Sequence, residues 1–285
     1  MLLLPQHLFD QSNVHVLLRD GERAIIGKTV YAPLYERSGY VSMHAVNIVL
    51  AGEQILESSE GNTLRIRAGQ IILIPRGLYQ ISDLLPADGT PFRSILFYFD
   101  DAIVQRYLGD YSVKEPFRGE VPDFLKLNRN PPLNAFVEVL SFVYGDVPPD
   151  NPALYRLKTL ELLNLIDRAD SDFDLPAFLF RLTLPKQRNL RHFMEANFNK
   201  PLKIQDFADL TGRSVSSFRR DFKEQFNVVP KDWLRTKRLQ LAKKLLAEDR
   251  REVQEVATAV GYESVSYFIE QFRSAEGISP GKYRG

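Results

Sequence analysis

The sequence IQDFADLTGRSVSSFRRDF at residues 204–222 is followed by a second copy of its pattern, VQEVATAVGYESVSYFIEQF, at residues 253–272. The two copies match at an offset of 49 residues as far as the glycine and of 50 after it, because one residue is inserted there. The matching residues are Ile204, Phe207, Ala208, Gly212, Ser216, Phe218, Phe222 and Pro230 in the first copy, and Val253, Val256, Ala257, Gly261, Ser266, Phe268, Phe272 and Pro280 in the second. The last third of the chain therefore contains one small structural unit twice.

Each copy predicts two helices joined by a tight turn. The glycine allows a positive φ angle in the turn, and a small residue before it lets the two helices approach closely. Ser214 and Ser264 are placed to cap the second helix of their copies, and the two phenylalanines of each copy stand at i and i+4 on the inward face. The pattern is typical of a helix-turn-helix unit, repeated at about residues 201–226 and 251–276.

The outward face of each second helix is left free to bind another surface. A single polar residue there would most simply be solvated, but two capped copies with hydroxyl and basic groups favour the major groove of DNA and its phosphates. A helix predicted over residues 230–249 joins the copies, so that two recognition helices would lie about one DNA turn, roughly 34 Å, apart. The expected DNA-binding residues are Arg213, Ser214, Ser216, Ser217, Arg219, Arg220, Lys223, Ser264, Val265, Ser266, Tyr267, Glu270 and Arg273.

The second copy resembles a known family. It carries, in order, Ala257, Gly261, Tyr262, Ser266, Tyr267, Phe268, Phe272, Gly277, Ser279, Pro280 and Tyr283. This run is similar to the AraC/XylS family of bacterial transcription regulators, and the resemblance extends over about residues 189–283. It implies a transcriptional activator whose two recognition helices enter successive major grooves and whose DNA-binding half contacts RNA polymerase. Within the family the chain resembles the ExsA-like members, in which a small β-barrel and dimerising helices come first.

The resemblance also bears on individual side chains. It implies that Ser216 and Arg219 lie nearer the floor of the groove and that Arg220 lies nearer its rim. Glu270 departs from the family, because many members carry a basic residue at this place. A glutamate accepts a hydrogen bond from cytosine N4, or it pairs with an arginine of its own chain and touches no base.

The first part of the chain predicts a β domain followed by helices. Short β-branched and aromatic runs fill residues 23–99, with turn residues about every 8 to 9 positions, which is the spacing of strands in a sandwich or barrel. The barrel is expected at about residues 1–110 and helices at 134–144 and 153–169, within a helical part of about 131–180. With 181–187 as a linker, the chain is predicted to be an α+β two-domain protein, with an effector and dimerisation domain at 1–180 and an all-α DNA-binding domain at 185–285.

The β domain resembles a cupin barrel without its metal site. Gly69 and Pro75 fit the beginning of the second cupin motif, but Gln80 replaces its metal-binding histidine and no H-x-H pair occurs. We therefore expect no metal, no cofactor and no enzymatic activity, and an unknown small-molecule or protein effector instead. Polar residues that could face an effector pocket are His44, Asn47, Gln54, Arg65, Arg67, Tyr79 and Gln80, although a lone histidine among apolar residues is more typical of a structural role.

The helix predicted at 153–169 is apolar around its whole circumference, so it must be covered on both sides. One side can pack on the β domain, and the other can meet a second subunit or an adjacent helix. The first alternative predicts a homodimer through Leu154, Leu157, Leu160, Leu162 and Ile166.

Charge and composition narrow the possible functions of the protein and the compartment in which it acts. Residues 185–285 hold 20 Lys and Arg against 13 Asp and Glu, whereas residues 1–184 hold 17 against 23. This basic excess favours a DNA-binding half over a helix-turn-helix that acts only through protein contacts. The acidic clusters at 100–101 and 170–174 lie in predicted loops and do not form a catalytic pair. With 0 cysteines and no apolar run long enough for a membrane span, we expect a soluble bacterial protein of the cytoplasm that acts at the nucleoid.

Overall fold

The structure is a computed structural model that describes residues 2–109, 111, 122–128, 130–144, 149–169, 173–184, 188–248 and 251–283. The chain divides into two compact units, Met1–Leu184 and Pro185–Gly285. Part of the expected linker, at 185–187, and part of the second acidic cluster, at 170–172, lie outside the described residues. None of the described helices has both the length and the apolar character that a membrane span needs.

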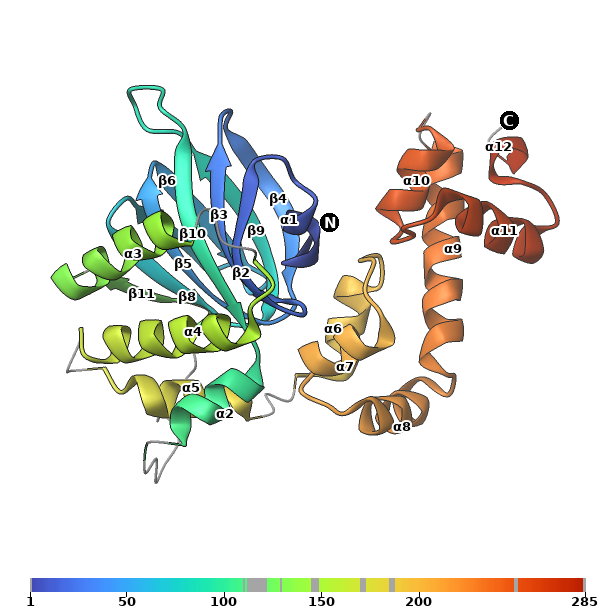
Figure 1. The fold of residues 1–285 in the computed structure, drawn as a ribbon. Coiled ribbons are helices and arrows are strands. Elements are labelled where there is room, and N and C mark those ends of the chain that lie inside the picture. The colour runs from blue at the N-terminus through green and yellow to red at the C-terminus, as the bar shows by residue number, and fades with distance from the viewer. Residues whose placement is uncertain are drawn as a thin grey trace. The chain divides into compact units, whose positions relative to one another are not determined.

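The N-terminal unit is built from two β-sheets (Figure 1). One has the order β1 (Leu2–Leu4), β4 (Leu34–Val41), β9 (Gly77–Leu84), β6 (Glu53–Ser58) and β7 (Thr63–Arg67). The other has the order β11 (Leu125–Asn128), β8 (Gln70–Ile74), β5 (His44–Ala51), β10 (Phe92–Phe99), β3 (Arg23–Val30) and β2 (Val14–Asp20). All neighbouring strands are antiparallel except β1 and β4.

The expected closed barrel is wrong for the described strands, because they form two separately hydrogen-bonded sheets. The chain passes from one sheet to the other at tight turns rather than continuing one hydrogen-bonded surface. Gly52 forms one of these turns, between β5 and β6. Its φ is +82°, and a Cβ atom there would lie 2.3 Å from the carbonyl oxygen of Leu84. Only glycine fits this turn.

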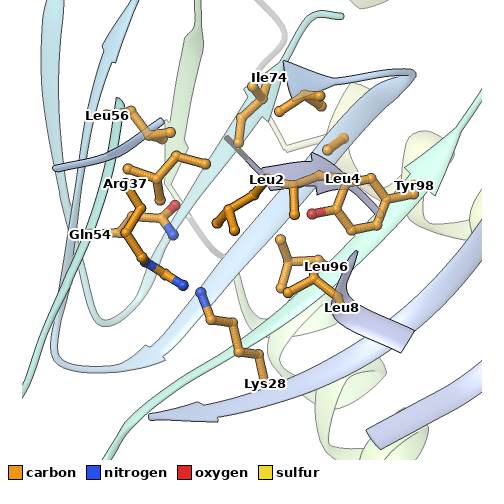
Figure 2. A pocket seen from close by; sticks show the side chains of 13 residues that line it. Leu2, Leu4, Leu8, Lys28, Arg37, Gln54, Leu56, Ile74, Leu96 and Tyr98 are labelled. Atoms are coloured by element: carbon orange, nitrogen blue, oxygen red, sulfur yellow. The ribbon is translucent and has the colours of Figure 1, made fainter. Parts of the chain in front are cut away.

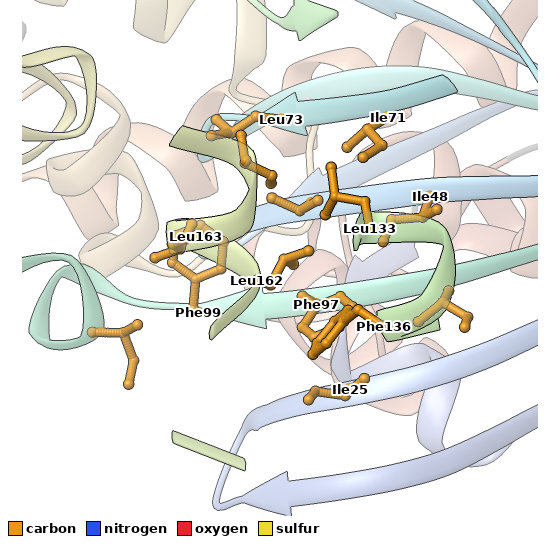
Figure 3. Close-up of a cluster of buried hydrophobic side chains, with 14 of the residues drawn as sticks. Ile25, Ile48, Ile71, Leu73, Phe97, Phe99, Leu133, Phe136, Leu162 and Leu163 are labelled. Atoms are coloured by element: carbon orange, nitrogen blue, oxygen red, sulfur yellow. The ribbon is translucent and has the colours of Figure 1, made fainter. Parts of the chain in front are cut away.

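The six-stranded sheet is buried on both faces, which explains its nearly continuous apolar strands. Ile26 and Leu96 point into the core between the sheets. Their chain neighbours Ile25 and Phe97 point to the opposite face, where helices cover them. Figure 3 shows Phe97 on this face beside Phe136, and their rings stack with centroids 6.1 Å apart.

Four helices belong to this second core: α2 (Asp101–Leu108), α3 (Pro131–Val143), α4 (Pro152–Asp167) and α5 (Leu175–Thr183). A short α1 (Gln6–Phe9) follows β1. The predicted helices at 134–144 and 153–169 are confirmed as α3 and α4, each beginning after an asparagine that caps it. The linker expected from residue 181 is wrong at its start, because α5 continues to Thr183.

Helix α4 is covered mostly by its own domain, which corrects the expected dimer interface. Leu162 and Ile166 are buried in the core beneath the helices, and Leu154 and Leu160 pack partly against it. Of the five expected interface residues, only Leu157 is clearly exposed, at 57%. The apolar circumference reflects burial between the sheet and the helices α2, α3 and α5, so the alternative of an adjacent helix accounts for most of it.

In the residues of the C-terminal unit that the structure describes, helices are joined by turns and short connections, and the predicted helix-turn-helix pattern is confirmed. Its helices are α6 (Leu190–Asn197), α7 (Ile204–Leu210), α8 (Val215–Phe226), α9 (Pro230–Glu248), α10 (Val253–Ala259), α11 (Val265–Glu276) and α12 (Pro280–Tyr283). The pairs α7–α8 and α10–α11 are the two helix-turn-helix units. Both turns contain the expected glycine with positive φ, +68° at Gly212 and +90° at Gly261.

Helix α9 contributes side chains to the cores of both helix-turn-helix units. Trp233 at its beginning packs edge-on against Phe222 of α8, with ring centroids 5.6 Å apart. Leu239, Ala242 and Leu246, further along, belong to the core around α10 and α11. A helix shared by two cores fixes the two helix-turn-helix units to one another. In Figure 1, α8 lies at the beginning of α9 and α11 lies beside its later part.

Candidate nucleic-acid interface and N-terminal cavity

The second helix of each unit begins with a capping serine, as predicted. The Ser214 hydroxyl accepts a hydrogen bond from the backbone N–H of Ser217 at 3.2 Å. The Ser264 hydroxyl accepts one from the backbone N–H of Tyr267, also at 3.2 Å. Each hydroxyl therefore accepts a hydrogen bond from a backbone N–H group that has no partner within its helix, in the first turn of α8 or α11.

Helix α8 separates its apolar and basic residues on opposite faces. Phe218 and Phe222 are fully buried, whereas Ser216, Arg219, Arg220 and Lys223 are exposed. Ser217 is half-buried and bonded to the capping serine, so those four side chains are the expected DNA-binding residues of α8 that are exposed. Arg219, Arg220 and Lys223 place three positive charges on the exposed side of α8, which suits the phosphates that line a DNA groove.

Arg213 does not belong to this exposed set, contrary to the prediction. Its side chain is only 10% exposed and pairs with Asp221, with 3.1 Å between Nε and Oδ2. Its Nη1 donates to the carbonyl oxygens of Thr211 and Arg188 at 2.7 and 3.1 Å. Arg213 stands in the turn before the cap, where its donors satisfy backbone carbonyls, so its role is structural. Desolvation raises the pKa of Asp221, but the hydrogen bonds and charges of Arg213 and Arg220 outweigh it and hold that pKa below its usual value.

Helix α11 exposes a different chemistry. Ser266, Tyr267, Glu270 and Arg273 are exposed. Val265 is half-buried against the core around α10 and α11, so it is a poor candidate for a base contact. Within the described part of the chain, Glu270 forms no ion pair. Of its two expected roles, pairing with an arginine of its own chain is therefore not seen among the described residues.

Most of the expected effector-pocket residues have structural partners instead. Arg65 and Arg67 are 54% and 69% exposed and both pair with Glu53 on the surface. The Nδ1 of His44 accepts a hydrogen bond from the backbone N–H of Arg76, so its Nε2 donates to Asp101 at 3.0 Å. These three predictions for a pocket are wrong, because strand alternation turns the arginines to solvent and His44 to the start of α2.

Tyr79 and Gln80 also have other roles. The Tyr79 hydroxyl donates to the carbonyl oxygen of Pro75 at 2.7 Å, and the Gln80 side chain accepts a hydrogen bond from Ser38 at 3.0 Å. The described residues contain no group of three or more His, Asp or Glu side chains placed to hold a metal ion.

A small cavity does lie between the two sheets (Figure 2). Of the seven expected residues only Gln54 lines it, and Asn47 stands behind, donating to the Gln54 side chain at 2.7 Å. Its volume is about 20 Å³, room for about one water molecule. It is lined by Leu2, Leu4, Leu8, Lys28, Arg37, Val41, Ala45, Gln54, Leu56, Ile74, Ile81, Leu96 and Tyr98.

The charged residues at this cavity were not expected from the sequence. Asp83 is fully buried and pairs with Lys28 at 2.5 Å and Arg37 at 2.6 Å, and it also accepts a hydrogen bond from Gln54 at 2.8 Å. Burial lowers the pKa of Lys28, and the Asp83 carboxylate opposes that shift. One feature of the sequence could have predicted the buried Lys28. It lies in the apolar strand AIIGKTV, and side chains alternate along a strand, so Lys28 points to the same side as Ile26 and Val30, which is the inward side.

Comparisons with known proteins agree with this division. Residues 207–285 match the family described as a helix-turn-helix domain, and residues 44–178 match the ExsA N-terminal regulatory domain. The HTH-type transcriptional regulator ExsA of Pseudomonas aeruginosa is 26% identical over 239 residues, covering 84% of this chain and 85% of ExsA. The thermoregulatory protein LcrF of Yersinia pestis is 25% identical over 254 residues, covering 85% and 89%.

Among solved structures, ToxT from Vibrio cholerae is similar with a TM-score of 0.46 and 12% identity, over 94% of this chain and 98% of that one. The two sequence relatives extend over both units of the chain, and the two family matches fall one in each unit. The chain is therefore homologous to AraC-family regulators that join an ExsA-type regulatory domain to a helix-turn-helix domain.

Proposed function

We propose that this protein activates transcription by binding double-stranded DNA with α8 and α11 in successive major grooves. The observation that carries the proposal is the pair of capped helix-turn-helix units whose cores share α9. A rigid connection of this kind sets the spacing of two recognition helices, and spacing is what a pair of half-sites requires. The relation to ExsA and LcrF, which are named as regulators, supports the same function.

The exposed cations of α8 supply the sequence-independent part of the binding. Arg219 and Lys223 can each displace counterions from phosphates, so affinity should fall linearly with the logarithm of the salt concentration. Base edges would be read by side chains that both helices expose, including Ser216 and Glu270. We propose contact with RNA polymerase and action at the bacterial nucleoid as consequences of this function, and no enzymatic reaction.

For dimerisation we propose a surface on α3 in place of the buried face of α4. Val139, Phe142 and Val143 are 52%, 89% and 46% exposed, outside the side of α3 that is buried in the core. A second copy of this chain is the proposed occupant, because most soluble oligomers are homo-oligomers and a two-fold dimer, in which the same patch meets itself, is the commonest of them.

The size of the cavity limits what the regulatory domain can sense there. Pockets for small ligands usually measure about 300 Å³ or more, whereas this cavity has room for about one water molecule. We therefore propose that the effector is a protein bound at the surface of the N-terminal unit, rather than a small molecule in this cavity.

A mobility-shift assay tests the central function. The full chain is mixed with a labelled pool of random duplexes at moderate salt, with unlabelled nonspecific DNA as competitor. We expect retained complexes that enrich a defined sequence over repeated rounds. A chain that acts only through protein contacts would shift no DNA, and that result would contradict the proposal.

A further inference from the structure

Helix α8 holds an acidic side chain between two arginines. Oδ2 of Asp221 accepts the Nε–H of Arg213 at 3.1 Å, and Oδ1 accepts Nε–H and Nη2–H of Arg220 at 3.2 and 3.0 Å. Arg213 is itself fixed by the carbonyl oxygens of Arg188 and Thr211. A continuous series of contacts thus runs from the backbone of the turn, through Arg213 and Asp221, to Arg220.

Arg220 stands at the centre of the exposed face of α8. At 100° per residue it points about 180° away from the direction midway between Phe218 and Phe222, whereas Arg219 points only about 80° away. The Arg220 side chain is 73% exposed. When the outward face of α8 enters a groove, Arg220 therefore meets the base edges and Arg219 lies at the flank. This geometry favours the opposite order to the one that the family resemblance implied.

The bond to Asp221 leaves a specific edge of Arg220 available. A guanidinium group carries five N–H donors in one plane, and Asp221 takes the two on the Nε–Nη2 side. The end formed by Nη1 and Nη2 keeps two parallel N–H groups, which match O6 and N7 of guanine. Because Arg220 is already held, it loses less rotamer freedom when it binds.

We propose that Asp221 is a positioning residue for sequence recognition, which presents the Nη1–Nη2 edge of Arg220 to a guanine; this rests on the proposed DNA-binding function. Asp221 also offsets the charge of Arg220, so it weakens the attraction to phosphates that every sequence offers. Both effects raise specificity more than affinity. Glu224 provides a matched comparison, since it is an exposed acid on the same helix and pairs with no described cation.

The test compares Asp221→Asn with Glu224→Gln in the full chain, using duplexes enriched by the wild-type protein from a random pool. Affinity is measured by fluorescence anisotropy at one salt concentration, on the enriched duplex and on duplexes with each G·C pair changed in turn. We expect Asp221→Asn to lose roughly fivefold or more of the discrimination at one G·C pair. Glu224→Gln should shift the affinity for all duplexes alike.

Two further variants separate positioning from a merely structural role. Arg220→Lys keeps the Arg213–Asp221 pair and the charge but removes the forked donors, so it should lose discrimination at the same base pair even where Asp221→Asn fails to fold. In an Arg220→Ala background, Asp221→Asn should cause no further loss at that pair.

Full discrimination in a folded Asp221→Asn variant, full discrimination in Arg220→Lys, or a loss spread evenly over all positions would overturn the proposal. A wild-type chain that enriches no sequence would overturn the proposed function and this inference with it. A wild-type chain that enriches a sequence, beside unaltered variants, would overturn the inference alone.

Discussion

Glu270 occupies in α11 the position that Arg220 occupies in α8, fifty residues earlier. It faces outward without an ion pair to any described residue, so a hydrogen bond from cytosine N4 is the role the geometry favours. We expect Glu270→Ala to cost about 1 to 3 kcal/mol on the enriched duplex and nothing on one with that C·G pair replaced. Anisotropy on the two duplexes measures the difference. Uniformly tighter binding to both would show that Glu270 only repels phosphates.

Asp83 and Glu53 of the N-terminal unit each pair with two cations, but Asp83 is fully buried and the arginines that pair with Glu53 are exposed. Asp83 is fully buried between Lys28 and Arg37, so Asp83→Asn leaves both cations without their counter-charge. We expect a loss of about 3 to 5 kcal/mol in the free energy of unfolding, measured by urea titration. Glu53, which pairs with two exposed arginines, is the control, and Glu53→Gln should cost less than about 1 kcal/mol. Equal losses would refute the buried network.

Asp101 gives the N-terminal unit an acid-sensitive contact. Its hydrogen bond from His44, followed by the charge of Arg76, holds the pKa of Asp101 below its usual value although partial burial opposes this. A carboxyl with a lowered folded pKa stabilises the fold above its unfolded pKa, and this stability is lost as the pH falls through the folded value. The difference in unfolding free energy between wild type and Asp101→Asn should therefore shrink between about pH 5 and pH 2. A constant difference would contradict the contact.

At the scale of elements, the exposed apolar surface of α3 is the proposed dimer contact. Phe142 is 89% exposed, and Phe142→Asp should convert a dimer to a monomer without changing the unfolding temperature of the domain. Tyr31, which is 74% exposed elsewhere in the same unit, supplies the control Tyr31→Asp. Light scattering at micromolar concentration gives the mass of both variants. A monomeric wild type, or a dimer that tolerates Phe142→Asp, would rule out this surface.

The elements differ in how far sequence alone could predict them. The helix-turn-helix units were predictable because caps, glycines and paired phenylalanines are local signals, and two copies reinforce each other. Helix α4 shows the limit: its apolar circumference says that both sides are covered, but not which element covers them. The cavity was harder still, since Lys28, Arg37 and Asp83 lie on three different strands and only the pairing of those strands brings them together.

At the scale of the whole molecule, the two recognition helices should contribute unequally. Helix α8 exposes Arg219, Arg220 and Lys223, whereas α11 exposes Arg273 beside the acidic Glu270. The second unit therefore meets the phosphates with less positive charge. Base changes under α8 should cost more affinity than changes under α11 when both are measured at one salt concentration. Equal costs would show that charge does not determine the contribution of each unit.

A hydroxyl-radical footprint of the full chain on its enriched duplex tests most directly whether both units bind DNA together. Because α9 joins the cores of the two helix-turn-helix units, binding by both units should give two protected stretches about one helical turn, roughly 10 base pairs, apart. Protection of a single stretch, or protection no stronger than on unselected DNA, would contradict it.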